Sequence, residues 1–241
     1  MTIHIGILAH SAEGATLSYR TVWQEGIGKM GAHDHPRITM SGGPMAPTME
    51  LWERGDLAAL RQLFLEDAQR LAAAGADFFI LPDNTAHMAL EQPGADFAIP
   101  CLHIAEIVAA AAQAAGHRKI GVLGTSWTME GPVYIEALAR RNLERAIPAP
   151  ADRQLIHNAI FDELCLGEFR DSTRQEFVRI ISGLQSQGCD AVALVCTEIP
   201  LLVTEYISPL PILDSTRLQA KAAVAVALGE QAMPQWRCGP I

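Results

Sequence analysis

The sequence reads GADFFILPDNT at Gly75–Thr85 and GCDAVALVCTE at Gly188–Glu198. When the two stretches are laid side by side, Asp83 falls on Cys196. Each of these residues follows a short apolar run, and the end of such a run is where a strand of an α/β protein delivers side chains to a site. Two equivalent positions that each carry a proton-transferring side chain indicate chemistry performed from two faces of one substrate.

The repeat extends to two further pairs of segments in the same order. Ile5–Ser11 matches Ile120–Ser126, and Ile99–His103 matches Leu210–Asp214. The spacing between the first two segments is also nearly kept, at 69 positions in one copy and 67 in the other (75 − 6 and 188 − 121). This period is far longer than the roughly 20–50 residues of solenoid repeats. The pattern therefore indicates an internal duplication of one βα half-domain.

The duplication predicts an α/β fold made of two pseudosymmetric domains, each with a parallel sheet. We expect residues 1–103 to form the first half, completed by the C-terminal segment 214–241, and residues 104–213 to form the second half. Both halves have about 100 residues or more, which lies within the usual range of domain sizes.

Apolar runs and helical periodicity predict strands that alternate with helices, as in βαβ units with parallel sheets. The expected strands are Ile3–Leu8, Phe78–Leu81, Pro100–Leu102, Lys119–Leu123 and Ala191–Val195. The expected helices are Leu17–Lys29, Asp56–Ala74, Ile104–Ala115, Pro132–Arg145 and Thr173–Gln187. Loops are expected at His10–Gly14 and Pro148–Asp152.

The composition limits the classes of partner. Of the 241 residues 49% are hydrophobic, and the net charge is −9, which argues against a nucleic-acid surface. Five scattered cysteines without a CxxC motif indicate reduced thiols in a cytoplasmic protein and give no metal-ligand spacing. The chain starts a strand almost at once, without a signal peptide, and its Ala-rich run at Ile104–Ala115 is too short to span a bilayer. We therefore expect no nucleic-acid partner and no membrane association.

Several motifs resemble those of one known enzyme family. The run DNTAH at Asp83–His87 resembles the Cys-Asn-Thr-Ala-His motif of the aspartate/glutamate racemase superfamily, and CTEIPLL at Cys196–Leu202 resembles its second cysteine motif. Ile120–Thr125 with Thr128, Phe161–Leu164 and the N-terminal strand add to the likeness, which covers essentially the whole chain.

This resemblance implies two α/β domains with the active site in the cleft between them, no cofactor, and a homodimer. It also implies that one base removes the proton from Cα while a second group protonates the opposite face. The sequence departs from the family at one place, because Asp83 stands where the first catalytic cysteine is expected. Some relatives carry Thr there and act on one enantiomer only, so symmetric racemisation does not follow from the resemblance.

Asp83 and Cys196 are the candidate catalytic residues. A Cα proton next to a carboxylate is a very weak acid, so its removal needs a positioned base and donors for the developing charge. Cys196 works as a thiolate, whose ordinary pKa of ~8.5 must be lowered, whereas Asp83 starts near ~3.9 and must be raised by burial or by a nearby negative charge. The alternative is that Asp83 stays ionised and binds the substrate ammonium, which leaves Cys196 as the sole acid/base.

Hydroxyl and amide side chains near the ends of the predicted strands are candidate donors to a substrate carboxylate, although each is equally able to cap a helix. They are Ser11, Asn84, Thr85, Thr125, Ser126, Thr128 and Thr197. His10 and Glu198 are candidates for orienting the catalytic pair. No residues are assigned to a metal.

The sequence therefore predicts a cofactor-independent isomerase that moves a proton at Cα of an amino acid or a related α-substituted carboxylic acid. A carboxylate at position 83 would repel a second anionic group, which favours a substrate that is neutral or cationic beyond its amino-acid head. Two alternatives stay open. One is a single-thiol decarboxylase or cis-trans isomerase of a small diacid, and the other is a non-catalytic paralogue that binds an amino acid.

Overall fold

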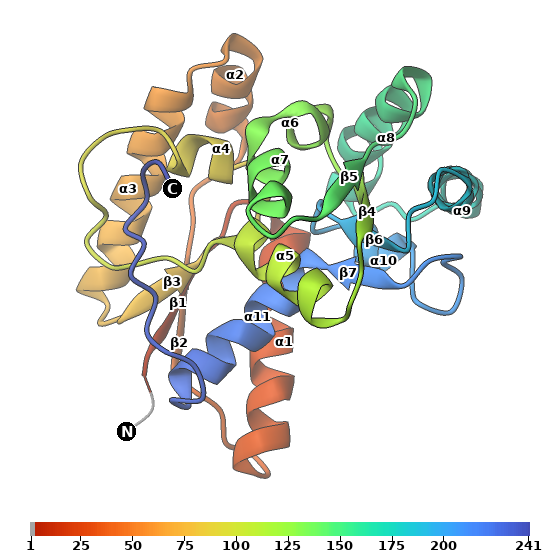
Figure 1. Cartoon of the computed structure of the whole chain (residues 1–241). Helices are drawn as coiled ribbons and strands as arrows, with labels where there is room; N and C mark the ends of the chain where they lie inside the picture. Colours follow the sequence, from red (N-terminus) through yellow and green to blue (C-terminus); the bar gives the residue numbers. More distant parts are fainter. Residues whose placement is uncertain (1–2) are drawn as a thin grey trace. The chain divides into compact units, whose positions relative to one another are not determined.

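The computed structural model describes residues 3–241, which divide into two compact units (Figure 1). The first unit contains the chain up to Ile104 together with Gln219–Ile241, and the second contains Ala105–Leu218. Each unit is built on its own parallel β-sheet with helices packed against it. The predicted α/β class with two parallel sheets is confirmed.

The sheet of the first unit has the strand order β2-β1-β3, and all its strands are parallel. The strands are β1 (Ile5–Leu8), β2 (Ile38–Ser41) and β3 (Phe78–Ile80). The helices are α1 (Ala12–Met30), α2 (Ala46–Arg54), α3 (Leu57–Ala73), α4 (His87–Leu90) and most of α11 (Ser215–Ala227).

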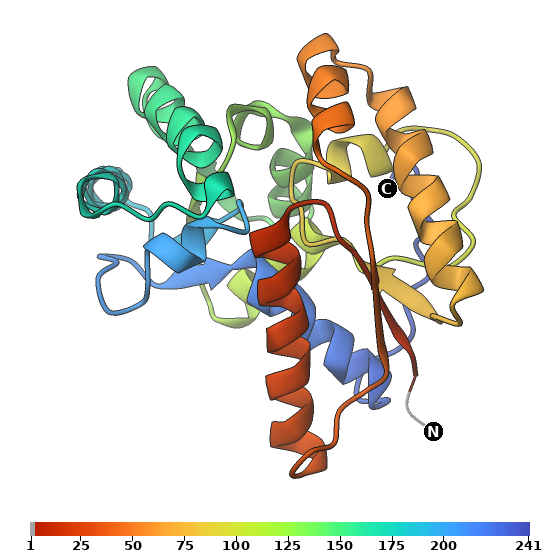
Figure 2. The same ribbon diagram turned by 180° about the vertical axis from the view of Figure 1, so that it is seen from behind.

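The two faces of this sheet are covered by different helices. Ile5 and Ile7 pack with Val22 of α1 and with a row of Ala and Val side chains of α11. Helix α3 covers the opposite face, as Figures 1 and 2 show. The close approach of α3 depends on Gly6, because a Cβ there would lie 3.2 Å from the Leu71 side chain.

The sheet of the second unit has the strand order β5-β4-β6-β7, again fully parallel. Its strands are β4 (Lys119–Leu123), β5 (Glu144–Ala146), β6 (Ala191–Leu194) and β7 (Ile212–Asp214). Its helices are α5 (Ile104–Ala114), α6 (Ser126–Glu130), α7 (Pro132–Ala139), α8 (Pro150–Asp162), α9 (Asp171–Ser186) and α10 (Ile199–Leu202), with one 3-10 turn at Leu164–Leu166.

The main core of the second unit lies between the sheet and helices α8 and α9. Leu123 and Leu194 of the sheet pack with Ile160 of α8 and Phe177 of α9, and all four are at most 1% exposed. Burial of large apolar side chains of this kind contributes about 1.5–3 kcal/mol each. This core supports the ends of β4 and β6, which carry the predicted site residues.

The duplication is visible in matching hydrogen bonds at the start of each central strand pair. In the first unit, the backbone N–H of His4 donates to Asp77 Oδ2 at 2.7 Å, and the N–H of Asp77 donates to His4 O at 2.9 Å. In the second unit, the N–H of Lys119 donates to Asp190 Oδ1 at 3.2 Å, and the N–H of Asp190 donates to Lys119 O at 3.0 Å. The same aspartate therefore joins the same two strands in both units.

Three expected segments differ from the structure. The expected loop His10–Gly14 is wrong beyond Ser11, because α1 already begins at Ala12 and the Ser11 hydroxyl accepts the N–H of Gly14 at 3.2 Å. The expected helix Pro132–Arg145 ends at Ala139, since Asn142 adopts a left-handed conformation (φ 56°) that breaks the helix before strand β5. The expected loop Pro148–Asp152 is helical from Pro150, where proline suits the first turn of α8.

Several other elements were missed or were less regular than expected. The elements without a counterpart in the sequence-based prediction are strands β2, β5 and β7 and helices α2, α4, α6, α8, α10 and α11. The predicted strand Pro100–Leu102 is reduced to a single parallel bridge between Cys101 and Phe79. The remaining predicted strands and helices are present, with ends shifted by a few residues.

Gly42 allows the chain after β2 to approach the segment that leads to His10. A Cβ at position 42 would lie 1.9 Å from the carbonyl oxygen of Ala9, whereas a Cβ at the neighbouring Gly43 would meet nothing within 4 Å. We expect Gly42→Ala to lower the free energy of unfolding by about 1–3 kcal/mol, because the backbone must shift to relieve the overlap. Gly43→Ala serves as the matched control and should change it by less than ~1 kcal/mol. Urea unfolding measures both, and equal effects of the two substitutions would contradict the packing argument.

Candidate active site

In the first unit the parallel pairing of β1 with β3 brings His10 to Asp83. Paired residues of these strands are 73 positions apart, as in Ile7 and Ile80, and His10 and Asp83 keep this separation just beyond the strand ends. His10 Nδ1 and Asp83 Oδ2 form a hydrogen-bonded ion pair. The same register that builds the sheet therefore places the two side chains in contact.

The other nitrogen of His10 reaches helix α2, which fixes where its proton lies. The Thr48 hydroxyl donates its single proton to the carbonyl of Met45 at 2.6 Å. It can therefore only accept in its 2.7 Å contact with His10 Nε2, so Nε2 carries a hydrogen. The contact between His10 Nδ1 and Asp83 Oδ2 then needs one further proton. The His10–Asp83 pair thus holds one proton between its two side chains.

The environment of Asp83 favours its ionised form. Burial alone would raise the pKa of this carboxyl, but the charge and hydrogen bond of His10 and the N–H of Ala86 outweigh burial and lower it below its usual value. Asp83 Oδ1 accepts that N–H at 2.9 Å, so both carboxylate oxygens have partners. The lowered pKa makes Asp83 a weak base by itself.

His87 fixes the backbone of Asp83 from the other side. Its Nε2 accepts the N–H of Ile104 at 3.2 Å, so its Nδ1 carries the hydrogen and donates to Asp83 O at 2.8 Å. His87 is completely buried, and burial together with the neighbouring His103 lowers its pKa to about 3. The ring is therefore neutral at physiological pH and serves as a fixed link that positions Asp83.

In the second unit the equivalent register places Thr125 beside Cys196. Paired residues of β4 and β6 are 71 positions apart, as in Lys119 and Asp190 at the strand starts, and Thr125 and Cys196 keep the same separation (196 − 125). Gly124 permits this close approach, because a Cβ there would lie 2.8 Å from the carbonyl oxygen of Val195.

Cys196 is paired with a buried carboxylate from its own segment. Its Sγ donates to Glu198 Oε2 at 3.0 Å, and the Thr197 hydroxyl donates to the same oxygen at 3.1 Å. The exposed fractions of Cys196 and Glu198 are only 7% and 3%. Burial and the negative charge of Glu198 raise the pKa of the Cys196 thiol well above its ordinary value, with a further contribution from Cys165. The thiol is therefore protonated, and its hydrogen-bond acceptor is the carboxylate of Glu198.

The predicted substrate-binding hydroxyls have several different placements. Thr125 caps α6 by accepting the N–H of Thr128 at 3.1 Å, and the two hydroxyls lie 3.0 Å apart. Ser11 caps α1 in the same way. The side chains of Asn84, Thr85 and Thr197 are buried next to Asp83 and Cys196 along the chain. Within each unit these residues gather at the strand ends that carry the catalytic candidates.

Sequence reasoning missed a cluster of half-buried aromatic rings beside Ser126. The backbone N–H of Ser126 donates to His157 Nδ1 of α8 at 3.2 Å. The ring of His157 meets Trp127 and Phe161 with centroid separations of 5.1 and 4.9 Å, and those two rings lie 5.7 Å apart. Phe161 and Cys165 also pack against the core cluster that contains Cys196. The three aromatic residues come from two segments 30 residues apart, so no local sequence pattern predicts that their rings meet.

Thr48 is a second functional candidate that the sequence did not reveal, since its contact with His10 joins parts of the chain 38 positions apart.

Residues 3–241 contain no group of three His, Cys, Asp or Glu side chains arranged to hold a metal ion. None of the helices in the same part of the chain has the length and apolar character that spanning a membrane requires.

The depressed pKa of His87 makes a prediction for stability. The unfolded chain takes up this proton near pH 6.5, but the folded protein does so only near pH 3, so stability is lost as the pH falls below 6.5. At ~1.36 kcal/mol per pH unit, we expect the free energy of unfolding to fall by about 2–3 kcal/mol between pH 6.5 and 4.5. In His87→Gln, whose amide can replace both hydrogen bonds, this pH dependence should largely disappear. Urea titrations across this range test it, with the exposed His33→Asn as control, and an unchanged slope in His87→Gln would rule out the assignment.

The chain is similar to several known proteins. The family model described as Asp/Glu/Hydantoin racemase matches residues 6–223. A broad specificity amino-acid racemase of Bacillus subtilis is 26% identical over 172 residues, which are 71% of this chain and 74% of that protein. A glutamate racemase of Aquifex aeolicus is 29% identical over 163 residues, 65% of this chain and 61% of that protein.

Solved structures agree with this match. A Yersinia pestis protein assigned as an Asp/Glu racemase superposes with a TM-score of 0.81 at 31% identity, covering 95% of this chain and 100% of that one. An aspartate racemase homologue of Pyrococcus horikoshii has the same fold, with a TM-score of 0.77 at 23% identity and coverage of 95% and 100%. The predicted superfamily and the predicted racemase-type enzyme are confirmed: this chain belongs to the Asp/Glu/Hydantoin racemase family.

Proposed function

We propose that this racemase acts without a cofactor on Cα of an α-amino acid, with Asp83 and His10 serving one face of the substrate and Cys196 and Glu198 serving the other. One observation carries the proposal. At each of the two equivalent positions of the internal repeat, the candidate catalytic side chain is hydrogen-bonded to a second group that can give or take a proton. Two groups that each give and take one proton are what inversion at a carbon centre requires.

The reaction in one direction begins at Cys196. The thiol proton passes from Sγ to Glu198 Oε2, which lies 3.0 Å away, and leaves a thiolate. The thiolate takes the Cα proton, and the electron pair of the broken Cα–H bond delocalises onto the substrate carboxylate. The proton held by His10 and Asp83 then passes to the opposite face of Cα. Each step breaks one bond to hydrogen and forms another.

The two directions use different protonation states of the enzyme. After the first turnover Cys196 and Glu198 hold one proton more than at the start, and the His10–Asp83 pair holds one fewer. A molecule of the product enantiomer is converted back from this state, with Asp83 and His10 as the base. The asymmetry between the pairs implies unequal rates in the two directions, because an Asp–His pair and a Cys–Glu pair differ in proton affinity.

The developing negative charge on the substrate carboxylate requires hydrogen-bond donors. The candidates are the hydroxyls and amides of Ser11, Asn84, Thr85 and Ser126, since Thr125 and Thr128 bond to each other and the Thr197 hydroxyl donates to Glu198. The Ser126 side chain is half-buried, and its backbone is fixed by His157. It is therefore the donor of the second unit best placed for a carboxylate.

The aromatic cluster of Trp127, His157 and Phe161 favours an apolar substrate side chain over a second carboxylate. Burial lowers the pKa of His157, so this ring is neutral and supplies no positive charge. The arginines near α6 and α8 are already engaged, since Arg145 bonds the carbonyl of Met129 and Arg153 pairs with Glu130. The Bacillus subtilis relative is named a broad specificity amino-acid racemase, and a broad substrate range is compatible with such a substrate.

A second activity is favoured by the protonated state of Cys196. A decarboxylase of a small malonate-like acid generates its carbanion by loss of carbon dioxide, so it needs one acid and no base. The raised pKa of Cys196 suits such an acid. Carbon dioxide release from methylmalonate would separate this activity from racemisation.

Isotope exchange tests the two-faced mechanism. In deuterated water, both enantiomers of alanine, valine, phenylalanine, aspartate and glutamate are followed by NMR and chiral chromatography. We expect deuterium at Cα together with racemisation, fastest for an apolar amino acid. In Asp83→Asn, racemisation should stop while one enantiomer still exchanges with retention through Cys196. In Cys196→Ser, exchange of that enantiomer should fall by about 10²–10⁴-fold.

Cys189→Ser is the matched control, because Cys189 is also buried and precedes the same strand at its opposite end. It should exchange at close to the wild-type rate. The proposal is wrong if the wild-type protein shows neither exchange nor racemisation with any of these amino acids, or if Asp83→Asn racemises normally.

The pairing of Cys196 with Glu198 makes a separate prediction. Glu198 raises the pKa of the thiol through its charge, so Glu198→Gln should lower that pKa and let the thiolate form at lower pH. The rate of alkylation of Cys196 by iodoacetamide, followed by peptide mass spectrometry, should therefore rise at lower pH in Glu198→Gln than in the wild type. Cys165, alkylated in the same samples, provides the internal reference. A midpoint that stays in place or moves to higher pH would refute the assigned pairing.

A further inference from the structure

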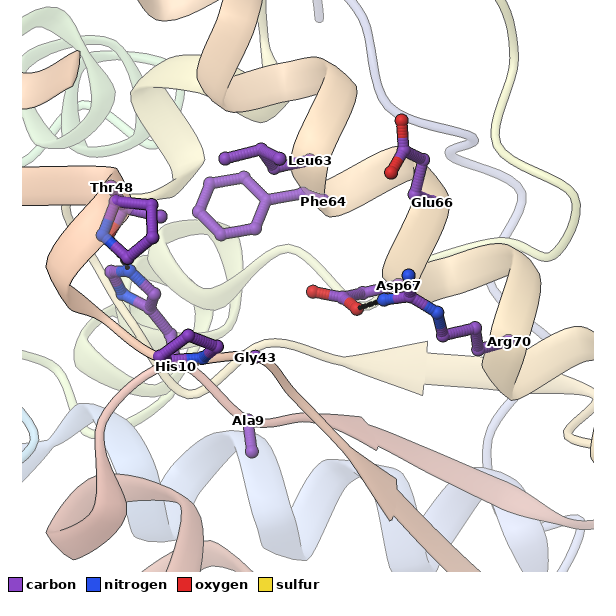
Figure 3. A pocket seen from close by; sticks show the side chains of 11 residues that line it. Ala9, His10, Gly43, Thr48, Leu63, Phe64, Glu66, Asp67 and Arg70 are labelled. Atoms are coloured by element: carbon purple, nitrogen blue, oxygen red, sulfur yellow. Dashed lines mark hydrogen bonds and ion pairs between the residues drawn. The ribbon is translucent and has the colours of Figure 1, made fainter.

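The first unit contains a cavity of about 190 Å³ between the loop after β1, the loop before α2 and helix α3 (Figure 3). Since one water molecule takes up roughly 30 Å³ of liquid, the cavity has room for an organic molecule of about six to eight non-hydrogen atoms. Its walls are partly apolar, through Phe64, Leu63 and two prolines. Among the predicted site residues only His10 lines it.

Asp67 of α3 gives the cavity a buried charge. This residue is 9% exposed, and Arg70 Nη1 donates to its Oδ1. Arg70 is the sole partner of Asp67 among residues 3–241. Figure 3 shows the second carboxylate oxygen pointing away from Arg70 toward the space between Phe64 and His10. The Asp67 side chain is 12% exposed, so this oxygen is open to the cavity, and its position suits a ligand that brings an N–H group.

Arg70 adds a positive charge beside this oxygen. Its side chain is 63% exposed and follows Asp67 by one helical turn, so it lies toward the mouth of the cavity while Asp67 lies inside. A buried negative group and an adjacent positive group complement a molecule that carries both charges on neighbouring atoms. An α-ammonium bound to Asp67 and an α-carboxylate bound to Arg70 would satisfy both, and Phe64 and Leu63 would contact a short apolar side chain.

We propose that this cavity is a regulatory site for a small α-amino acid. His10 and Thr48 line the cavity, and Thr48 accepts the Nε2 hydrogen of the same ring whose Nδ1 shares a proton with Asp83. An occupant that touches the His10 ring changes the position of this proton and hence the rate of proton transfer at Asp83. The regulatory effect rests on the proposed function, whereas binding in the cavity does not.

Binding of 2-aminoisobutyrate tests the site. This amino acid has seven non-hydrogen atoms and no Cα proton, so it cannot be racemised. Calorimetry on the full chain should show a binding event that weakens at least tenfold in Asp67→Asn and persists in Glu66→Gln. Glu66 is a matched control, since it precedes Asp67 on the same helix and its carboxylate points away from Asp67 in Figure 3. Isobutyrate and tert-butylamine, which each lack one charge, should bind at least tenfold more weakly than 2-aminoisobutyrate.

Equal affinities in the wild type and in Asp67→Asn would overturn the proposal, as would tert-butylamine binding as tightly as the amino acid. Arg70→Gln provides a second variant, because Arg70 is mostly exposed and its loss leaves the core intact; it should also weaken binding at least tenfold. Binding that survives in Cys196→Ser and Asp83→Asn places the ligand outside the catalytic residues. If no amino acid undergoes Cα exchange but the Asp67-dependent binding persists, the proposed function fails while the cavity site stands.

Regulation has its own readout. Addition of 2-aminoisobutyrate should change kcat for racemisation of the substrate, not merely raise KM, and the change should be absent in Asp67→Asn. An effect on KM alone, equal in both proteins, would show simple competition at the catalytic residues and would contradict the regulatory role.

Discussion

The parallel register of the two central strand pairs is the constraint on which the site depends. In the first unit every pair between β1 and β3 is separated by 73 residues, and the His10–Asp83 contact continues this spacing beyond the sheet. In the second unit the spacing is 71, and it continues to Thr125 and Cys196. Because carboxyl ends of parallel strands meet at one edge, the strand pairing that buries the core also assembles the chemistry.

The two halves of the repeat share one fold but carry side chains of different proton affinity at their equivalent positions. An aspartate by itself keeps no proton at neutral pH, so the proposed role of Asp83 relies on His10, its hydrogen-bonded neighbour, to hold one. A cysteine holds its proton already, and in the proposed reaction Glu198, which is hydrogen-bonded to Cys196, accepts it. Thr125 occupies the position equivalent to His10, but its hydroxyl cannot store an extra proton. The proposed proton acceptor, Glu198, therefore comes from the segment of Cys196 itself. Each pair joins two unequal groups by a hydrogen bond.

The sequence predicted the parts of the fold that repeat, and it failed where the copies diverge. The apolar runs before Asp83 and Cys196 are buried on both faces, so the strands were recognisable. Strand β2 is half-exposed at a sheet edge, and its short run lacks the continuous apolar character of β1. Helix α2 begins without a side-chain cap at Met45, so neither it nor the contact of Thr48 with His10 had a local signal. The burial of Glu198 was equally hidden, since charged residues are usually exposed.

Charges that are largely removed from water are unfavourable for folding unless each is compensated, and in this protein three of them lie at or beside the proposed sites. Asp83 and Glu198 belong to the two pairs proposed to transfer protons, and Asp67 faces the cavity that His10 also lines. His10 therefore faces two sites, with Nδ1 on Asp83 and Nε2 on Thr48 at the cavity wall. Coupling through one ring is reciprocal. If an occupant of the cavity shifts the proton of the pair, then protonation of the pair changes the affinity for the occupant by the same factor.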